Sequence, residues 1–217
     1  QKAGHGSWCS SPDGKRTYLV YLCGRPLPGS EDCVLGRETG LAEIVWKDDW
    51  PYVVQSDGSL QNTPPEYVEV PVSDDNDSVQ SRPGTGASCI HYIFNNSDFL
   101  RDFKTLRTPL TEQRCSISER RGYLRIHGGQ SPWSRYEQSL VARRQEDFCF
   151  TAETKMEFEP DYFQQYAGLS YRYDEETQYL LQVTWNEQKG KVLQLNTIMP
   201  GSFDQGFELS LRQNAPV

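Results

Sequence analysis

The stretch GHGSWCSSPDGKRTYLVYLC, residues 4–23, decides the fold of the first part of the chain. The dipeptide Asp13-Gly14 at its centre is the strongest short-range signal for a β-hairpin, because tight hairpin loops need residues that accept a positive φ. The flanking residues include aromatic and β-branched types that favour strands. We therefore predict antiparallel strands over residues 4–10 and 17–23, with Cys9 facing Tyr18 and Cys23 facing Gly4.

The next segment extends this sheet. The sequence LAEIVW, residues 41–46, alternates in polarity and places Ala42 and Ile44 on the face opposite Glu43. Residues 4–53 therefore predict three or four antiparallel strands, which is about one blade of a β-propeller. A sheet of this size is too small to hold a core alone.

Residues 56–90 are rich in Pro, Asp, Ser and Gly, which predicts a linker between two domains. Short alternating segments with turn residues between them return after residue 90, a pattern typical of a β-sandwich or barrel. These segments are GYLRIHG (122–128), SLVARRQ (139–145), FCFTAETKMEFEP (148–160), YAGLSYRYD (166–174), QYLLQVTW (178–185) and KVLQL (191–195).

Composition narrows the classes of ligand. The net charge of −8 over 217 residues argues against nucleic acid, and the apolar runs are too short to cross a bilayer. Aromatic residues make up 12% of the chain, which fits either stacking on sugars or packing within sheets. The six Cys form no CxxC motif, so a structural zinc site is not expected, and we expect the cysteines to be free and buried.

Two residues are candidates for ligand contact. His5 lies between two glycines within a predicted strand, where it is equally compatible with a ligand contact and with a hydrogen bond in the core. Arg37, in the segment LGRET at residues 35–39, has a planar fork suited to a carboxylate or to adjacent hydroxyls. The alternative for Arg37 is a structural ion pair with Glu38, Glu43 or another carboxylate.

Carboxylates for acid–base chemistry are plentiful, but none is flanked by a nucleophile or a metal motif. The five considered are Asp48, Asp49, Glu157, Glu159 and Asp161. We interpret Glu157 and Glu159 as solvated, since both lie on the polar side of an alternating segment. No phosphate-binding, dinucleotide or serine hydrolase motif is present.

Four longer motifs carry a resemblance to a known family. GHGSW (4–8), YLVYLCGRPL (18–27), LGRETGLAEIVWKDDWPYV (35–53) and EQSLVARRQEDFCFTAETKMEFEP (137–160) resemble the two-domain β-xylosidases of glycoside hydrolase family 43. The resemblance implies an all-β chain: the last blade of a five-bladed propeller over residues 1–55, a linker over 56–90, and an incomplete concanavalin A-like β-sandwich over 91–217. Both ends look cut, so we expect an internal or C-terminal fragment of a larger enzyme.

The resemblance also implies a division of the chemistry. In the family an Asp activates water, a Glu protonates the leaving oxygen, and a second Asp tunes that acid, with inversion at the anomeric carbon. These carboxylates precede the GHGSW-like strand, so no catalytic residue is expected in this chain. His5 and Arg37 match residues of the pocket rim, where Arg37 would contact xylose hydroxyls and keep the base ionised. Calcium near the propeller axis is the one cofactor that the resemblance raises, through His5.

We therefore expect part of a xylan 1,4-β-xylosidase that removes terminal xylose from xylo-oligosaccharides when intact, with α-L-arabinofuranosides as further substrates and an oligomer as one option. The chain alone is expected to be inactive, with no nucleic-acid or membrane partner and no compartment indicated. The alternative is a non-catalytic carbohydrate-binding or interaction β-sandwich, which an exposed aromatic platform would favour. An independent hydrolase using Glu157 or Asp161 is disfavoured.

Overall fold

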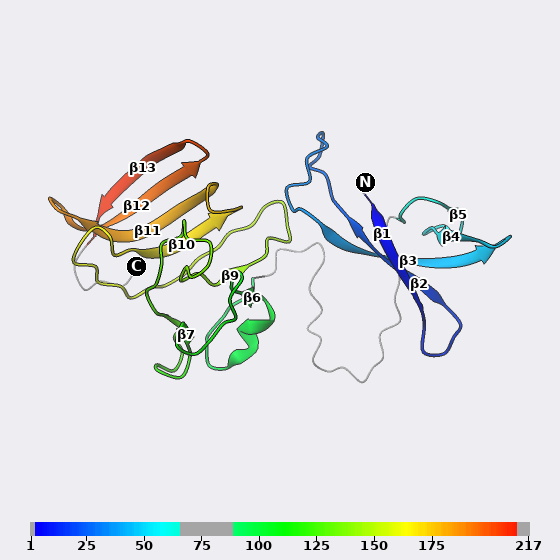
Figure 1. Cartoon of the computed structure of the whole chain (residues 1–217), viewed down its shortest axis with the longest axis horizontal. Coiled ribbons are helices and arrows are strands. Elements are labelled where there is room, and N and C mark those ends of the chain that lie inside the picture. The colour runs from blue at the N-terminus through cyan, green and yellow to red at the C-terminus, as the bar shows by residue number, and fades with distance from the viewer. Residues whose placement is uncertain (1–2, 66–88, 212–217) are drawn as a thin grey trace. The chain divides into compact units, whose positions relative to one another are not determined.

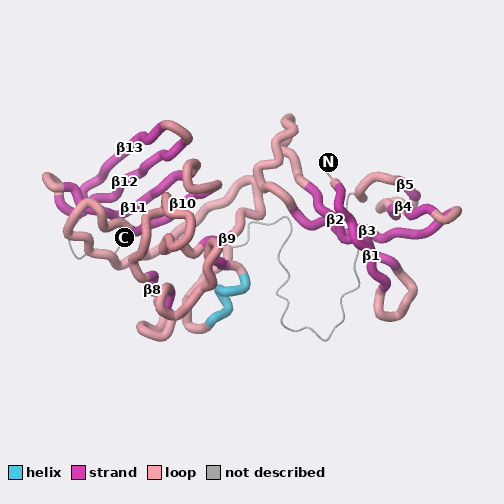
Figure 2. Tube along the Cα trace, viewed as in Figure 1, coloured by secondary structure: helices cyan, strands magenta, loops and turns pink. Residues whose placement is uncertain are grey.

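The computed structural model describes residues 3–65 and 89–211, which form β-strands and one short 3-10 helix, η1 (Ser97–Arg101) (Figures 1 and 2). The chain divides into two units. The first is Gln1–Ile90 with Gln145–Phe150, and the second is His91–Arg144 with Thr151–Val217. Within the described residues, no helix has the length and apolar character needed to span a membrane.

The first unit contains one antiparallel sheet of five strands, in the order β1-β2-β3-β4-β5 (Figure 1). Its strands are β1 (Gly4–Ser10), β2 (Thr17–Cys23), β3 (Glu38–Lys47), β4 (Trp50–Val54) and β5 (Leu60–Gln61). The predicted hairpin is confirmed, and Cys9 does face Tyr18. The pairing of Gly4 with Cys23 is wrong: a β-bulge between Gly4 and Ser7 shifts the register, so Gly4 faces Leu22.

Alternation along β3 gives this sheet its buried side. Ala42 is fully buried and Ile44 is 4% exposed, as the polarity pattern predicts. Gly40 lies under the ring of Tyr21, where a Cβ would come within 2.5 Å of a ring carbon. The close approach of an aromatic ring therefore explains why a glycine occupies this strand position.

The segment predicted as a linker, residues 56–90, is described only in part. Strand β5 lies within it and pairs with β4, while residues 66–88 lie outside the described residues. The segment Gln145–Phe150 belongs to the first unit. There the Arg25 guanidinium donates to the Glu146 carbonyl at 2.6 Å and lies 5.5 Å from the centre of the Phe148 ring.

The second unit is built around a four-stranded antiparallel sheet, β10 (Ala167–Arg172), β11 (Gln178–Asn186), β12 (Gly190–Met199) and β13 (Ser202–Ser210). Two small sheets accompany it: β6 (Phe103–Lys104) with β9 (Ala142–Arg143), and β7 (Cys115–Ser116) with β8 (Arg125–Ile126). The buried apolar residues of the large sheet are Leu180, Val183, Val192 and Ile198.

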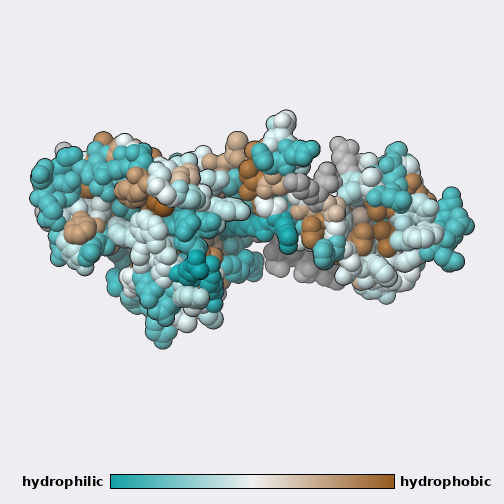
Figure 3. All heavy atoms as spheres, turned by 45° about the horizontal axis from the view of Figure 1, so that its top comes forward, coloured by the Kyte–Doolittle hydropathy of each residue, from teal (hydrophilic) through white to brown (hydrophobic). Residues whose placement is uncertain are grey.

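Strand register gives the large sheet two chemically different faces. One row across the four strands consists of Leu169, Leu181, Leu195 and Phe207. A row on the opposite face consists of Arg172, Gln178, Ile198 and Phe203. The second face, here called the polar face, also carries Gln182, Gln194, Asn196 and Glu208. On the side of the molecule in view in Figure 3, hydrophilic residues dominate and hydrophobic ones form small separate patches.

Three strand predictions in the second unit need correction. Residues 151–160 form no strand in the described structure; side-chain contacts, such as the ion pair of Glu159 with Lys191, attach this extended segment instead. The segments 122–128 and 139–145 contain only the two-residue strands β8 and β9. Strand β13 was not predicted, although Pro200-Gly201 at its start is a turn signal.

The cysteines are free, as predicted, but most are not buried. Cys115 alone is buried among the six, and its burial raises the pKa of its thiol to about 11. Cys9, Cys89 and Cys149 are exposed. Cys9 lies on β1 at the edge of the first sheet, and Cys89 and Cys149 lie outside the strands, so the three lack the surrounding core that the prediction assumed.

Candidate functional site

His5 lies at the bulge of β1, near the beginning of the first sheet. Its φ of 48° is the left-handed conformation, which non-glycine residues seldom adopt, and its side chain is exposed. Its neighbour Gly6 is held against Leu19, because a Cβ there would come within 2.6 Å of the Leu19 Cδ1 atom. The exposed position excludes the core hydrogen bond that the sequence left open for His5.

Arg37 directly precedes β3 and follows a tight turn. The Gly36 N–H donates to the Cys33 carbonyl at 2.9 Å, and Gly36 has a φ of 71°. Leu35, at 6% exposure, anchors the turn, whereas Arg37 is exposed. The turn thus fixes the backbone position from which the Arg37 side chain extends.

Register brings His5 and Arg37 to the same end of the sheet. Gly4 of β1 faces Leu22 of β2, and Leu22 faces Thr39 of β3. His5 follows Gly4 by one residue, and Arg37 precedes Thr39 by two. His5, near the beginning of β1, and Arg37, directly before β3, therefore lie at the same end of the sheet, with only β2 between their strands.

The two carboxylates considered as structural partners of Arg37 bind other arginines. Arg25 donates from Nη2 to Glu38 Oε1 at 2.8 Å and from Nε to both oxygens at 3.0 and 3.1 Å. This pairing raises the pKa of the Arg25 guanidinium. Glu43 lies 3.6 Å from Arg16 near the hairpin loop. Both ion pairs involve carboxylates of β3, the strand that Arg37 directly precedes, and they attach this strand to its surroundings.

The remaining carboxylate candidates have structural surroundings. Asp48 and Asp49, with φ values of 52° and 65°, form the two-residue turn between β3 and β4, at the end of β3 away from Arg37. Glu157 is exposed, which confirms the solvated interpretation, and it also pairs with Arg120 and accepts from the Tyr123 hydroxyl at 2.9 Å. Those two contacts lower the pKa of Glu157, so it is unsuited to donate a proton near neutral pH.

Glu159 and Asp161 also differ from a catalytic pair. Glu159 contacts Lys191 Nζ at 2.7 Å, and the Lys191 side chain is only 1% exposed. The Glu159 side chain is itself 43% exposed, so the solvated interpretation is confirmed and this ion pair adds to it. The Asp161 N–H donates to Gln165 at 2.9 Å. In the part of the chain that the structure describes, no group of three or more His, Cys, Asp or Glu could hold a metal ion.

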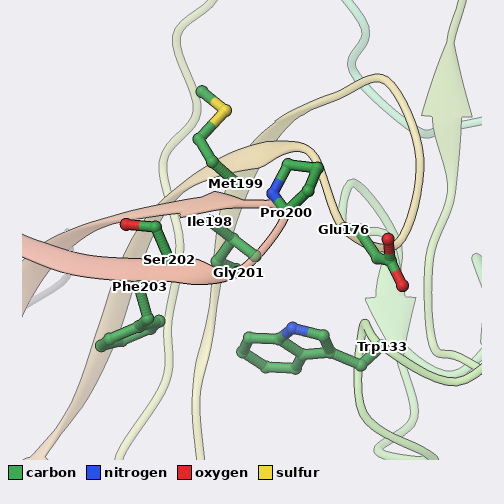
Figure 4. Close-up of a pocket in the computed structure, with 8 residues that line it drawn as sticks. All are labelled: Trp133, Glu176, Ile198, Met199, Pro200, Gly201, Ser202 and Phe203. Atoms are coloured by element: carbon green, nitrogen blue, oxygen red, sulfur yellow. The ribbon is translucent and has the colours of Figure 1, made fainter.

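Sequence reasoning missed a groove on the second unit. The turn between β12 and β13, residues 199–202, lines it together with Trp133, Glu176 and Phe203 (Figure 4). The groove is open and has a volume of about 410 Å³. Trp133 and Glu176 belong to loops without a recognised motif, so the available signal was the Pro200-Gly201 turn two residues before the aromatic Phe203.

Comparisons with known families place both units. The family described as "Beta xylosidase C-terminal Concanavalin A-like domain" matches residues 92–214. The family described as "Glycosyl hydrolases family 43" matches residues 1–51. The two matches together confirm an all-β chain made of a short propeller segment followed by a concanavalin A-like sandwich domain.

Individual relatives agree with these matches. The chain is 36% identical to the beta-xylosidase of Bacillus subtilis over 214 residues, covering 94% of this chain and 38% of the relative. It is 41% identical to xylosidase/arabinosidase 43B of Humicola insolens over 175 residues, covering 80% of this chain and 30% of the relative.

Among solved structures, the xylan beta-1,4-xylosidase of Bacillus halodurans superposes with a TM-score of 0.76 at 36% identity. The match covers all of this chain and 40% of that structure, so the chain spans well under half the length of these relatives. Because the C-terminal domain match alone covers more than half of the residues, the chain belongs to the β-xylosidase/arabinosidase enzymes of glycosyl hydrolase family 43.

Proposed function

We propose that this chain is the substrate-contacting and C-terminal part of a xylan 1,4-β-xylosidase-type enzyme that removes terminal xylose from xylo-oligosaccharides with inversion. The observation that carries the proposal is the register that brings His5 and Arg37 to one end of a family 43 sheet. The names of the relatives supply the sugar, and the name of the Bacteroides ovatus relative, a non-reducing end alpha-L-arabinofuranosidase, supports α-L-arabinofuranosides as further substrates.

Arg37 orients the sugar in this proposal. Its planar fork can donate two parallel N–H bonds to adjacent hydroxyls of a pentose, which fixes the position of the ring. Its permanent positive charge stabilises the ionised form of a nearby carboxylate and so lowers the pKa of that carboxylate. The base therefore stays ready to accept a proton from water, while His5 supplies a second polar contact at the same rim.

The carboxylates that perform acid–base catalysis belong, in this proposal, to polypeptide outside the 217 residues. Inversion needs a base and an acid roughly 6.5–9.5 Å apart, so that a water molecule fits between the base and the sugar. Of the candidates considered, Asp48 and Asp49 form a turn, and Glu157 and Glu159 are held in ion pairs. Without that pair the chain binds pentosides weakly and hydrolyses none of them.

The domain boundaries follow the same proposal. Residues 1–55 form the terminal propeller blade, residues 56–90 connect it to the second domain, and residues 91–217 form the β-sandwich domain. This division agrees with the family matches to residues 1–51 and 92–214.

A chimera tests the role of Arg37. This chain replaces the matching 214-residue region of the Bacillus subtilis relative, and the hydrolysis of an aryl β-xyloside is measured. Loss of charge-assisted hydrogen bonds worth about 1.5–3 kcal/mol predicts that Arg37→Ala lowers kcat/KM by roughly 100-fold. Arg16→Ala, at the other end of the same sheet, is the matched control and stays within about 2-fold. An active chimera that is indifferent to Arg37→Ala contradicts the proposal.

A further inference from the structure

The groove of the second unit combines flat aromatic rings with an acidic group. Trp133 is 43% exposed and Phe203 is 59% exposed, so both present ring surface to solvent. Figure 4 shows the Trp133 indole lying between the Glu176 carboxylate and the Gly201–Phe203 segment. The volume of about 410 Å³ lies within the roughly 300–1,000 Å³ of small-molecule sites.

An ion-pair cluster holds the walls of this groove in place. Arg172 of β10 donates from Nη1 to the Pro132 carbonyl at 2.8 Å, and its Nη2 lies 3.8 Å from Glu175. The Arg172 side chain is only 8% exposed. Arg135 adds a contact of 3.0 Å from Nε to Glu175. Since Trp133 follows Pro132 and Glu176 follows Glu175, the same cluster positions both groove residues.

Strand register completes the floor of the groove. Arg172 and Phe203 belong to one cross-strand row on the polar face, with Gln178 and Ile198 between them. Phe203, the second residue of β13, therefore lies on the same face of the sheet as Arg172, which holds the loop at Pro132. Gly201, with a φ of 74°, makes the turn that brings Phe203 back beside the loop.

The charges around the groove favour a neutral ligand over a cation. Glu175 is contacted by Arg107, Arg135 and Arg172, and Asp174 and Glu176 flank it in sequence, so three cations are balanced by three carboxylates beside the groove. A balanced site of this kind offers a cation no net electrostatic attraction, so a neutral ligand suits it. Glu176 is exposed, and a carboxylate there can accept hydrogen bonds from hydroxyl groups.

We propose that this groove binds a pentose unit of a xylan chain, with the Trp133 indole stacked on the sugar ring and Glu176 accepting from two of its hydroxyls. A sugar suits the site because one side of its ring is apolar and its rim carries hydroxyl donors. The identity of the sugar rests on the proposed function, whereas the site itself rests on the geometry of the second unit.

Titration of the full 217-residue chain with xylohexaose tests the site. Calorimetry gives the Kd, and the indole N–H signal of Trp133, assigned by its loss in Trp133→Ala, reports the place of binding. We expect a Kd of about 1 mM, typical of a shallow site, and a shift of the Trp133 signal. Trp133→Ala weakens binding at least about 10-fold and Glu176→Gln about 3-fold, while Tyr173→Ala, 84% exposed on the same turn as Glu176, changes it less than about 2-fold.

The outcomes separate this inference from the proposed function. Binding that survives Trp133→Ala in a folded chain, binding lost in Arg37→Ala instead, or no binding at about 10 mM xylohexaose overturns the groove assignment. Each of these results leaves the Arg37 dependence of the chimera untouched. If Trp133→Ala does not fold, Glu176→Gln provides the test, and a Kd unchanged in that variant overturns the groove assignment. Conversely, the Kd for xylohexaose can depend on Trp133 while the chimera hydrolyses the aryl xyloside equally well with Arg37→Ala. That combination refutes the proposed function and leaves the groove assignment standing.

Discussion

Replacing Glu208 by Gln is expected to remove an acid-sensitive part of the stability of the second unit. The Glu208 side chain is 8% exposed on the polar face. It accepts hydrogen bonds from Lys189 Nζ at 2.7 Å, Gln194 Nε2 at 2.6 Å and Asn186 Nδ2 at 3.2 Å. These contacts, with Lys189 the strongest, lower the pKa of Glu208 from its ordinary 4.5 to about 2.

The size and sign of the effect follow from this shift. A carboxylate with a depressed pKa stabilises the folded state fully above its unfolded pKa, and this stabilisation is lost as pH falls through the folded pKa. A shift from 4.5 to about 2 corresponds to about 3 kcal/mol at 1.36 kcal/mol per pH unit. The Lys189 side chain is 52% exposed, so solvent screening reduces the expected effect to about 1–2 kcal/mol.

Urea unfolding at several pH values measures this effect. We expect Glu208→Gln to be less stable than the unmodified chain by about 1–2 kcal/mol at pH 6, with the difference shrinking as pH falls below 4.5 and reduced to about 0.5 kcal/mol or less near pH 2. Amide exchange of β11 and β12 assigns the loss to the second unit. Glu187→Gln removes an exposed carboxylate in the same β11–β12 turn and is the matched control for the loss of one negative charge. A Glu208→Gln difference that persists unchanged at pH 2 refutes the electrostatic reasoning.

Two substitutions, Gly168→Ala and Asp49→Gly, test the packing of the large sheet and the turn of the first sheet. In Gly168→Ala the new Cβ would lie 2.0 Å from the Leu181 carbonyl oxygen, so we expect a loss of about 3 kcal/mol in urea unfolding. The control Gly206→Ala meets only ordinary contacts at 3.6 Å and should change stability by less than about 1 kcal/mol; equal losses contradict the packing argument. Asp49→Gly relieves the positive φ of 65° in the β3–β4 turn and should raise thermal stability by about 0.5–1 kcal/mol, and a lower Tm would be the contrary result.

Local signals predicted the first sheet well, because its elements are close in sequence. The Asp13-Gly14 turn and the alternation around Ala42 are short-range features, and each is confirmed. The bulge at His5 escaped prediction, since it depends on how Gly6 packs against Leu19 of the partner strand.

The second unit shows where sequence patterns fail. Residues 151–160 alternate as cleanly as a strand, but pairing needs a partner edge, and a pattern within one segment does not supply one. The ion pair of Glu159 with Lys191 and the meeting of Trp133 with Glu176 join residues more than 30 positions apart. Contacts of this kind carry no local signal, so both the attachment of the segment and the groove required the structure.

The central claim is that Arg37 orients a pentoside whose acid and base lie on other polypeptide. The most direct measurement is the release of the aryl group from an aryl β-xyloside by the purified 217-residue chain and by its Arg37→Ala variant. The account predicts no release above the uncatalysed rate from either protein. Release by the unmodified chain that falls in Arg37→Ala would contradict it.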